Sequence, residues 1–276
     1  AQSKRTNMQP VSASDIPSKA GGEIPRPLTK DEIYAIVKKY GEAAARAQAS
    51  GFDCIEIHAG HSYLINQFLS PLTNKRTDEF GGSYENRARF ARLVLEAVRK
   101  EVGAQFPIIV RISADEFLEG GNTLEDTLKL LEYFHAEADI IDVSCGLVDS
   151  IQYQIDANYL PDGWRSYMAK AVKEAYAKPV ITTGNIRDPK VAEDILERGD
   201  ADLIGMGRQM IADPSWTNKV HYGKEDTIRK CISCNIGCSG HRIGLNRPIR
   251  CSVNPSVNEG EEYRSWKVKK PCNVVV

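Results

Sequence analysis

Short apolar runs alternate with longer amphipathic stretches along the chain from Thr29 to Met206. Within each run the apolar residues are nearly continuous, which is typical of a strand that is buried on both faces of a sheet. The predicted strands cover residues 51–59, 107–113, 139–144, 179–183 and 202–206. Apolar residues at helical spacing predict helices over residues 29–49, 83–102, 123–136, 163–177 and 189–198. A strand followed by a helix, repeated with short connections, predicts parallel βα units.

Polar and glycine residues gather where these predicted strands end, at His58, Arg111, Cys145-Gly146, Gly184-Asn185 and Gly207-Arg208. Parallel strands of this kind could form a doubly wound sheet or part of a (β/α)8 barrel, and no G-x-G-x-x-G motif follows any of them. Polar residues at the carboxyl ends favour a barrel whose site lies on that face, although doubly wound sheets also bind ligands there. We therefore expect an α/β fold of the (β/α)8 TIM-barrel type over residues 1–223.

The composition changes after Tyr222, and residues 224–265 are rich in Gly, Asn and Pro, which predicts a small loop-rich module. The module holds four cysteines with the spacing Cys231-x2-Cys234-x3-Cys238-x12-Cys251. Four thiolates this close can ligate one metal centre. Zinc sites usually pair one C-x2-C with a second pair of ligands, so the crowding favours an iron–sulfur cluster. Zinc stays open because His241 could replace one ligand, and unligated or disulfide-bonded cysteines are a third alternative.

Two histidines and a tyrosine follow the first predicted strand, in the sequence His58-Ala-Gly-His61-Ser-Tyr63. Imidazoles at the end of a strand can donate hydrogen bonds to a carbonyl oxygen, and a tyrosine can deliver a proton. His58, His61 and Tyr63 are therefore candidate catalytic residues. The alternative is that one or both histidines serve packing or bind a metal.

The last two predicted strands each end in a glycine-containing turn, Thr183-Gly184-Asn185 and Gly205-Met206-Gly207-Arg208. Exposed backbone N–H groups together with an arginine suit a phosphate, and phosphate sites after the last two strands are frequent in TIM barrels. Ordinary βα turns are the alternative interpretation.

Arg111 lies inside an otherwise apolar predicted strand. A buried arginine needs a partner. A bound anion or an electron-rich ring would serve, and a structural carboxylate such as Asp115 or Glu116 is the alternative.

Charge and composition exclude several classes of protein. The 276 residues carry 36 Lys and Arg against 37 Asp and Glu, so a global basic surface for nucleic acid is absent. No run approaches the about 18 consecutive apolar residues of a membrane-spanning helix. The first residues show no signal-peptide pattern, and clustered cysteines without such a signal favour a reduced, cytoplasmic compartment.

The segment from Gly51 to Phe90, GFDCIEIHAGHSYLINQFLSPLTNKRTDEFGGSYENRARF, resembles the flavin-dependent ene-reductases of the old yellow enzyme family. The later segments GNI and GMGRQMIADP resemble the FMN phosphate site of the same family. The cysteine module, followed by CSVNP, is similar to the multidomain branch that includes 2,4-dienoyl-CoA reductase, 2-enoate reductase and the bile-acid steroid oxidoreductases.

The resemblance implies specific roles. His58 and His61 would hydrogen-bond the substrate carbonyl, and Tyr63 would protonate the α-carbon. Arg111 would lie against the N1/O2 edge of FMN. The remaining assignments are Gly184, Asn185, Gly207 and Arg208 at the FMN phosphate, and Cys231, Cys234, Cys238 and Cys251 as ligands of a 4Fe-4S cluster. Electrons would pass from NAD(P)H through FAD and the cluster to FMN, and a hydride would then reach the β-carbon of the alkene, with desaturation as the reverse reaction.

The resemblance also implies a partial chain. Only barrel strands four to eight are expected, and residues 266–276 would begin an FAD- and NAD(P)-binding domain that is cut short, so we expect no activity from the chain alone. A homo-oligomer is left open.

One departure from the family bears on the substrate. The dienoyl-CoA branch has a second active-site histidine after its sixth strand, whereas residues 145–149 here read CGLVD. This favours a 2-enoate or a 3-oxo-steroid over a dienoyl-CoA thioester as the small-molecule substrate. The rival interpretations are a non-redox phosphate-binding barrel lyase or isomerase with a zinc-stabilised tail, and a zinc-type interaction module; bound flavin would exclude both.

Overall fold

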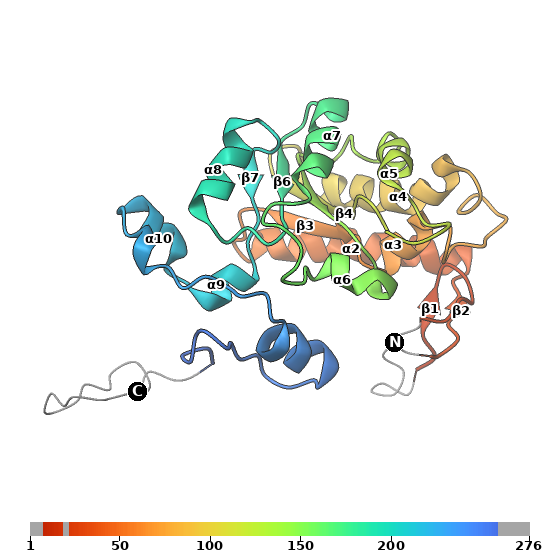
Figure 1. The fold of residues 1–276 in the computed structure, drawn as a ribbon. Helices are drawn as coiled ribbons and strands as arrows, with labels where there is room; N and C mark the ends of the chain where they lie inside the picture. The colour runs from red at the N-terminus through yellow and green to blue at the C-terminus, as the bar shows by residue number, and fades with distance from the viewer. Residues whose placement is uncertain (1–7, 19–21, 259–276) are drawn as a thin grey trace, which may run out of the picture.

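A parallel sheet lies at the centre of the computed structural model, which describes residues 8–18 and 22–258 (Figure 1). The strands follow one another in chain order, so each pairs with the next one along the sequence. They are β3 (Ile55–Ala59), β4 (Ile108–Ser113), β5 (Ile140–Ser144), β6 (Val180–Thr182) and β7 (Leu203–Ile204). Repeated right-handed βα units produce this order, and the predicted parallel α/β arrangement is confirmed.

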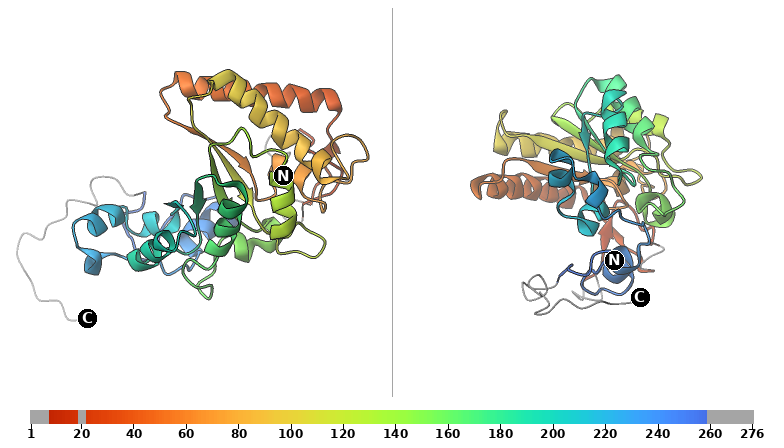
Figure 2. Two further views of the ribbon diagram at one scale, coloured as in Figure 1. Left: turned by 90° about the horizontal axis from the view of Figure 1, so that it is seen from above. Right: turned by 60° about the vertical axis from the view of Figure 1, so that its left-hand side comes forward.

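Each predicted helix is present. They are α2 (Lys30–Ala49), α4 (Tyr84–Val102), α5 (Leu124–Leu131), α7 (Ser166–Tyr176) and α8 (Pro189–Glu197). Hydroxyl side chains cap the first three, because Thr29, Ser83 and Thr123 each accept a hydrogen bond from the backbone N–H three residues on. The two longest helices, α2 and α4, pack side by side (Figure 2).

The two faces of the sheet differ in chemistry. Alternate strand residues such as Val110, Ile112, Ile141 and Val143 are fully buried and belong to the apolar core. The residues between them point to the opposite face, where the register sets polar side chains beside one another. On that face lie Glu56, His58, Arg111, Asp142 and Ser144.

The predicted and observed bounds of two elements, β3 and α5, differ because turns replace part of the predicted strand or helix. The strand predicted from Gly51 begins only at Ile55, because α2 ends at Ala49 and Gly51 turns the chain with a φ of 84°. The helix predicted over residues 123–136 ends at Leu131, after which a succession of turns carries the chain to β5. Tyr133, Phe134 and Ala138 each donate to the carbonyl three residues earlier in these turns.

Several short elements were not predicted. They are β1 (Val11–Ser12), which pairs with β2 (Arg26–Pro27), the helices α3 (Leu64–Leu69), α6 (Ile151–Gln154), α9 (Arg208–Ala212) and α10 (Trp216–His221), the 3-10 turns η1 (Val148–Ser150) and η2 (Glu225–Thr227), and the π-helix η3 (Ile236–Gly244). Each is shorter than the window over which hydrophobic periodicity can be read. The expected start of a further domain at residues 266–276 lies outside the described residues. Among the helices of the described chain, none is long and apolar enough to cross a membrane.

Candidate functional site

The predicted histidine–tyrosine group comes together at the carboxyl end of β3. The His61 Nδ1 atom lies 3.3 Å from His58 Nε2, and the ring centroids of His58 and Tyr63 are 5.1 Å apart. Tyr63 is 61% exposed, whereas His61 is buried. The sequence therefore places one buried and one half-buried imidazole beside an accessible phenol.

A tight turn after β3 sets this geometry. His61 and Ser62 both adopt left-handed backbone conformations, with φ values of 58° and 63°, which cost non-glycine residues free energy. The neighbouring strand offsets the cost, because the Ser113 hydroxyl accepts a hydrogen bond of 2.9 Å from the His61 backbone N–H. The Ser62 N–H is bound by the Asn66 side chain at 2.7 Å.

Both imidazoles are neutral at physiological pH. Burial, helped by the positive charge of Arg111, lowers the pKa of His58 to about 4. The same two causes lower the pKa of His61 to about 3. The rings can therefore act as neutral hydrogen-bond donors and acceptors, and the phenol of Tyr63 is exposed beside them.

Arg111 lies directly beside His58 in the sheet register, and Asp142 lies beside Arg111 on its other side. The Arg111 Nε atom is 3.2 Å from Asp142 Oδ2, and Arg111 Nη1 is 4.0 Å from Glu56 Oε1. Burial and the neighbouring Asp142 raise the pKa of Glu56.

The carboxylate partners of Arg111 are thus Asp142 and Glu56, and the alternative that named Asp115 or Glu116 is wrong. The Asp115 carboxylate instead accepts from the Phe117 N–H, and Glu116 is held by Ser70 and Asn122. The signal for Asp142 was available, since it is a charged residue inside the apolar run IIDVS, as Arg111 is inside VRIS.

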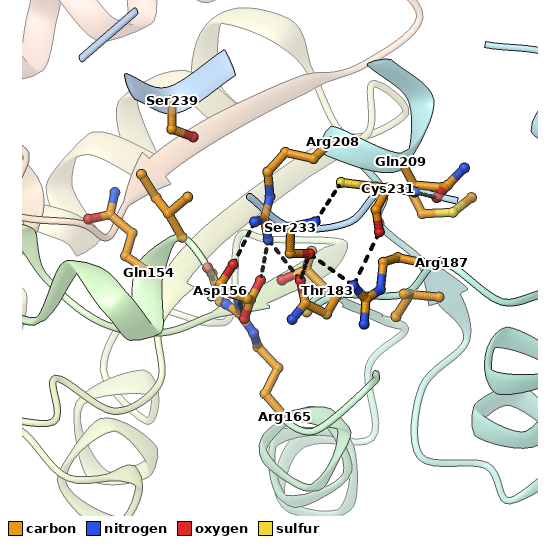
Figure 3. Close-up of a pocket in the computed structure, with 18 of the residues that line it drawn as sticks. Gln154, Asp156, Arg165, Thr183, Arg187, Arg208, Gln209, Cys231, Ser233 and Ser239 are labelled. Carbon is orange, nitrogen blue, oxygen red and sulfur yellow. Dashed lines mark hydrogen bonds and ion pairs between the residues drawn. The ribbon is translucent and has the colours of Figure 1, made fainter. Parts of the chain in front are cut away.

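A cavity of about 390 Å³ opens at the carboxyl ends of β4 to β7 (Figure 3). Arg111 lies in its wall, and so do the predicted phosphate residues Gly184, Asn185, Gly207 and Arg208. At two positions in this wall, steric crowding explains why the residue is a glycine. A Cβ at Gly184 would lie 2.6 Å from the Nε atom of Arg165, and a Cβ at Gly205 would lie 2.7 Å from the Thr183 side chain. Gly207, by contrast, faces open space.

Asp156 is a buried carboxylate in the cavity wall, and two arginines reach it from opposite sides (Figure 3). Arg165 pairs with Asp156 Oδ1, and Arg208 Nη2 lies 2.9 Å from Asp156 Oδ2. Arg208 also donates to Asn185 at 3.1 Å. The predicted phosphate residues are thus adjacent, but the Arg208 guanidinium is directed at protein acceptors. Sequence analysis missed both Asp156, in the connection after α6, and Arg165, the residue before α7.

Residues 231–239, the cysteine segment of the loop-rich module, form one side of this cavity. The Ser233 hydroxyl donates to Asn185 Oδ1 at 2.8 Å, and Arg208 donates to Asn235 Oδ1 at 2.7 Å. The Cys231 N–H donates to the Gln209 side chain at 2.9 Å. Polar contacts therefore join the cysteine segment to the turns after β6 and β7.

The four candidate ligands Cys231, Cys234, Cys238 and Cys251 line a second, small cavity of about 20 Å³. All four are free thiols. A hydrogen bond with Ser252 and nearby backbone N–H groups lower the pKa of Cys234, which favours its thiolate. Within residues 8–18 and 22–258, no three His, Cys, Asp or Glu side chains are arranged as a metal site. His241 lies outside the residues that line this cavity, and its ring lies 3.2 Å from the Pro248 carbonyl.

Sequential parallel strands, with polar side chains and an arginine-lined cavity at their carboxyl ends, are the arrangement of the barrel class of α/β proteins, in which that face carries the functional site. The chain belongs to the NADH:flavin oxidoreductase / NADH oxidase family, whose sequence profile matches residues 2–227. The resemblance expected from the sequence is therefore confirmed, and membership of this family implies the TIM barrel.

Individual relatives agree with this assignment. The chain is 44% identical over 274 residues to an NADH oxidase of Thermoanaerobacter brockii, which covers 97% of this chain and 42% of that protein. It is 33% identical over 283 residues to a cinnamate reductase of Clostridium sporogenes, covering 96% of this chain and 42% of that protein. A solved complex of 2-naphthoyl-CoA reductase with 2-naphthoyl-CoA superposes with a TM-score of 0.85 and 33% identity, over 90% of this chain and 38% of that one. The chain thus spans less than half the length of these proteins.

Proposed function

We propose that this chain forms the substrate-reducing part of a flavin-dependent ene-reductase, which reduces a C=C bond conjugated to a carbonyl group with electrons from NAD(P)H. The same parts would run the reverse desaturation. The observation that carries the proposal is the convergence of two neutral imidazoles and one accessible phenol at the end of β3, on the sheet face that bears Arg111. Family membership supports the flavin chemistry.

The three side chains divide the work. His58 Nε2 and His61 Nδ1 lie 3.3 Å apart, so one carbonyl oxygen could accept hydrogen bonds from both rings. These bonds would draw electron density from the conjugated alkene and stabilise the charge that develops on the oxygen. Tyr63 is exposed beside them and would protonate the α-carbon.

The 390 Å³ cavity fits FMN by its charge pattern. Arg111 lies in one part of the wall and would hold the N1/O2 edge of the flavin ring, while Gly184, Asn185, Gly207 and Arg208 in another part would hold the phosphate. Thr183, also in the wall, has a buried hydroxyl without a hydrogen-bond partner among the described residues. When bound, FMN would supply a hydride to the β-carbon of the alkene.

The cysteine module, residues 224–265, would carry a 4Fe-4S cluster on Cys231, Cys234, Cys238 and Cys251. Their thiols line one cavity, and thiolates are the ligands that iron–sulfur clusters require. Such a cluster would pass single electrons between FMN, bound by the barrel of residues 1–223, and an FAD in the intact protein. That order of carriers stays a prediction.

A 2-enoate is the substrate class that we favour. The similar proteins include one named for cinnamate and one solved with 2-naphthoyl-CoA. In both of these compounds an unsaturated system is conjugated to a carbonyl group. Residues 145–149 contain no histidine, which disfavours the dienoyl-CoA branch; a 3-oxo-steroid and an enoyl-CoA thioester are the other members of the class to screen.

The test starts with the intact protein, purified without oxygen. Iron, acid-labile sulfide, zinc and flavin are measured, and about four irons and four sulfides with FMN and FAD would support the proposed carriers. The flavin is then reduced with NADH or NADPH and mixed with cinnamate or, as the matched control, with saturated 3-phenylpropionate. Reoxidation of the flavin by cinnamate but not by 3-phenylpropionate supports the proposal. Zinc without flavin would overturn it and favour a non-redox phosphate-binding barrel or a zinc-type interaction module.

A further inference from the structure

Ser144 is a buried serine at the end of β5 that contacts the ring of His61. Its Oγ atom lies 2.8 Å from His61 Nε2 and 3.2 Å from Arg165 Nη1. Ser144 is 1% exposed, in the wall of the 390 Å³ cavity. The hydroxyl therefore has to find its partners within the protein.

The direction of these two hydrogen bonds follows from the groups involved. A guanidinium can only donate, so Ser144 Oγ accepts from Arg165. The single hydrogen of the hydroxyl is left for His61 Nε2, which is the one remaining partner of Ser144 Oγ in the described chain. The opposite assignment, with a proton on His61 Nε2, would make Ser144 accept twice and leave its own O–H buried without an acceptor, which is costly.

We propose that Ser144 holds the neutral imidazole of His61 in the tautomer that carries its proton on Nδ1, and thereby makes that N–H a permanent donor toward the oxygen of the bound substrate. Arg165 contributes to this arrangement, because its hydrogen bond to Ser144 Oγ leaves the Ser144 hydrogen to point toward the His61 ring. The identity of the acceptor rests on the proposed function; the tautomer itself does not. Ser144 is thus a positioning residue that acts through His61.

The supporting contacts around Ser144 are fixed. Arg165 is 2% exposed and paired with Asp156, which itself receives a hydrogen bond of 2.7 Å from Trp164 Nε1. The guanidinium is therefore held in place, and its Nη1 donor stays directed at Ser144. The Cys145 carbonyl also lies near the His61 ring, where it favours the protonated ring. The experiment therefore has to distinguish the two tautomers of His61.

His58 differs from His61 in this respect. Its Nδ1 atom is buried and has no hydrogen-bond partner in the part of the chain that the structure describes. Nothing comparable to Ser144 fixes its tautomer, so His58 Nε2 can accept from His61 Nδ1–H in the free protein and carry its own proton when a substrate oxygen arrives. The tautomer of His61 is therefore fixed, whereas that of His58 can change.

The experiment measures tautomers directly. The intact protein is labelled with ¹⁵N-histidine, and the ring nitrogens of His61 are observed by NMR at pH 7, assigned by their disappearance in His61→Asn. We expect a protonated Nδ1 and an unprotonated Nε2 in the wild type. A proton on Nε2 would overturn the proposal, whether or not the protein reduces any alkene.

Two serine variants then test the cause. Ser144→Ala removes the donor to Nε2 and should yield a mixture of both tautomers at His61. Ser70→Ala is the matched control, because Ser70 is also a buried serine but its hydroxyl donates to Glu116, so the tautomer of His61 should stay unchanged. An unaltered single tautomer in Ser144→Ala would show that another group sets it.

Kinetics separate this inference from the function it deepens. With cinnamate as the probe, Ser144→Ala should lower kcat/KM about 2- to 10-fold, the equivalent of one net hydrogen bond, while the rate of flavin reduction by the nicotinamide stays the same. If the wild type does not reduce cinnamate or any other enoate, the proposed function fails and the NMR result still decides the tautomer. If the tautomer shifts in Ser144→Ala and kcat/KM does not fall, the N–H of His61 does not serve the substrate.

Discussion

His58 and Arg111 lie directly opposite each other on the adjacent parallel strands β3 and β4. Asp142, the next residue across the sheet, pairs with the guanidinium at 3.2 Å. The imidazole loses its charge, because burial and the arginine together lower its pKa. This row of the sheet therefore presents one fixed cation and one neutral hydrogen-bonding ring to a ligand.

The lowered pKa of His61 predicts acid sensitivity of the folded state. The folded pKa of about 3 lies below the ordinary value near 6.5 that the unfolded chain would show. The unfolded state therefore binds more protons below pH 6.5, and the stabilisation that His61 contributes above that pH is lost as the pH falls toward 3. His61→Asn should reduce the dependence of the unfolding free energy on pH by up to about 1.4 kcal/mol per pH unit.

Urea unfolding between pH 7.5 and 4.5 measures this dependence. Equal slopes for wild type and His61→Asn would mean that the imidazole of His61 is protonated in the folded protein as readily as in the unfolded one.

Tyr63→Phe should separate the two half-reactions of the proposed enzyme. Loss of a general acid is expected to slow alkene reduction by about 10²- to 10⁴-fold. Flavin reduction by the nicotinamide should keep its rate, because the phenol takes no part in it. Stopped-flow absorbance of the flavin follows both steps, and Tyr133→Phe, which is partly exposed on the turn after α5, is the control. A parallel loss in both steps would point to a structural role for Tyr63.

Glycine substitutions should distinguish packing from ligand binding in the cavity wall. Gly184→Ala places a Cβ 2.6 Å from the buried Arg165 at a φ of 119°, so we expect a loss of about 2 kcal/mol or more in the free energy of unfolding, from overpacking and backbone strain. Gly207→Ala meets no atom within 4 Å and should keep its stability. If the Gly207 backbone holds the phosphate, Gly207→Ala will bind FMN more weakly than the wild type although its stability is unchanged.

Thermal unfolding and a flavin titration of the apoprotein give the two quantities. Unchanged FMN affinity in Gly207→Ala would remove Gly207 from the phosphate site. A fully stable Gly184→Ala would show that Arg165 can move away from β6.

Cys234→Ser should lower the iron and acid-labile sulfide content of the protein to near zero if the four cysteines hold one cluster. Ligation and folding are coupled in such sites, so a loss of structure in residues 224–258 is expected with it. Cys54→Ser is the control, because Cys54 is exposed and lies just before β3. Retention of the full iron content in Cys234→Ser would contradict the ligand assignment.

Sequence analysis predicted the repeating part of the fold well. Every strand of the central sheet and each long helix was indicated by periodicity, because these elements bury a continuous apolar face. The histidine–tyrosine group was also predicted, since its members are close in sequence and follow a strand directly. Residues 184–185 and 207–208 were brought together as expected, because parallel strands end at one edge.

The pairings that hold these groups could not be predicted. Asp142 is recognisable as a charged residue in an apolar run, but its pairing with Arg111 depends on the sheet register, which no single strand specifies. Asp156 lies in the connection after α6 and Arg165 directly before α7, and hydrophobic periodicity does not indicate that the two side chains meet. Ser144 contacts His61 across 83 residues of sequence. These contacts depend on packing between distant elements, and a small polar residue in a strand has many other uses.

The contacts between the cysteine segment and the cavity bear on how the protein can be shortened. A cut after residue 223, at the predicted boundary of the barrel, would leave the Gln209 side chain without the Cys231 N–H. It would also strip Asn185 of the Ser233 hydroxyl and Arg208 of the Asn235 side chain. The freed groups line the main cavity, so a truncated barrel would keep its sheet and lose the shape of its binding site. Shortened versions should therefore retain the chain at least through Asn235.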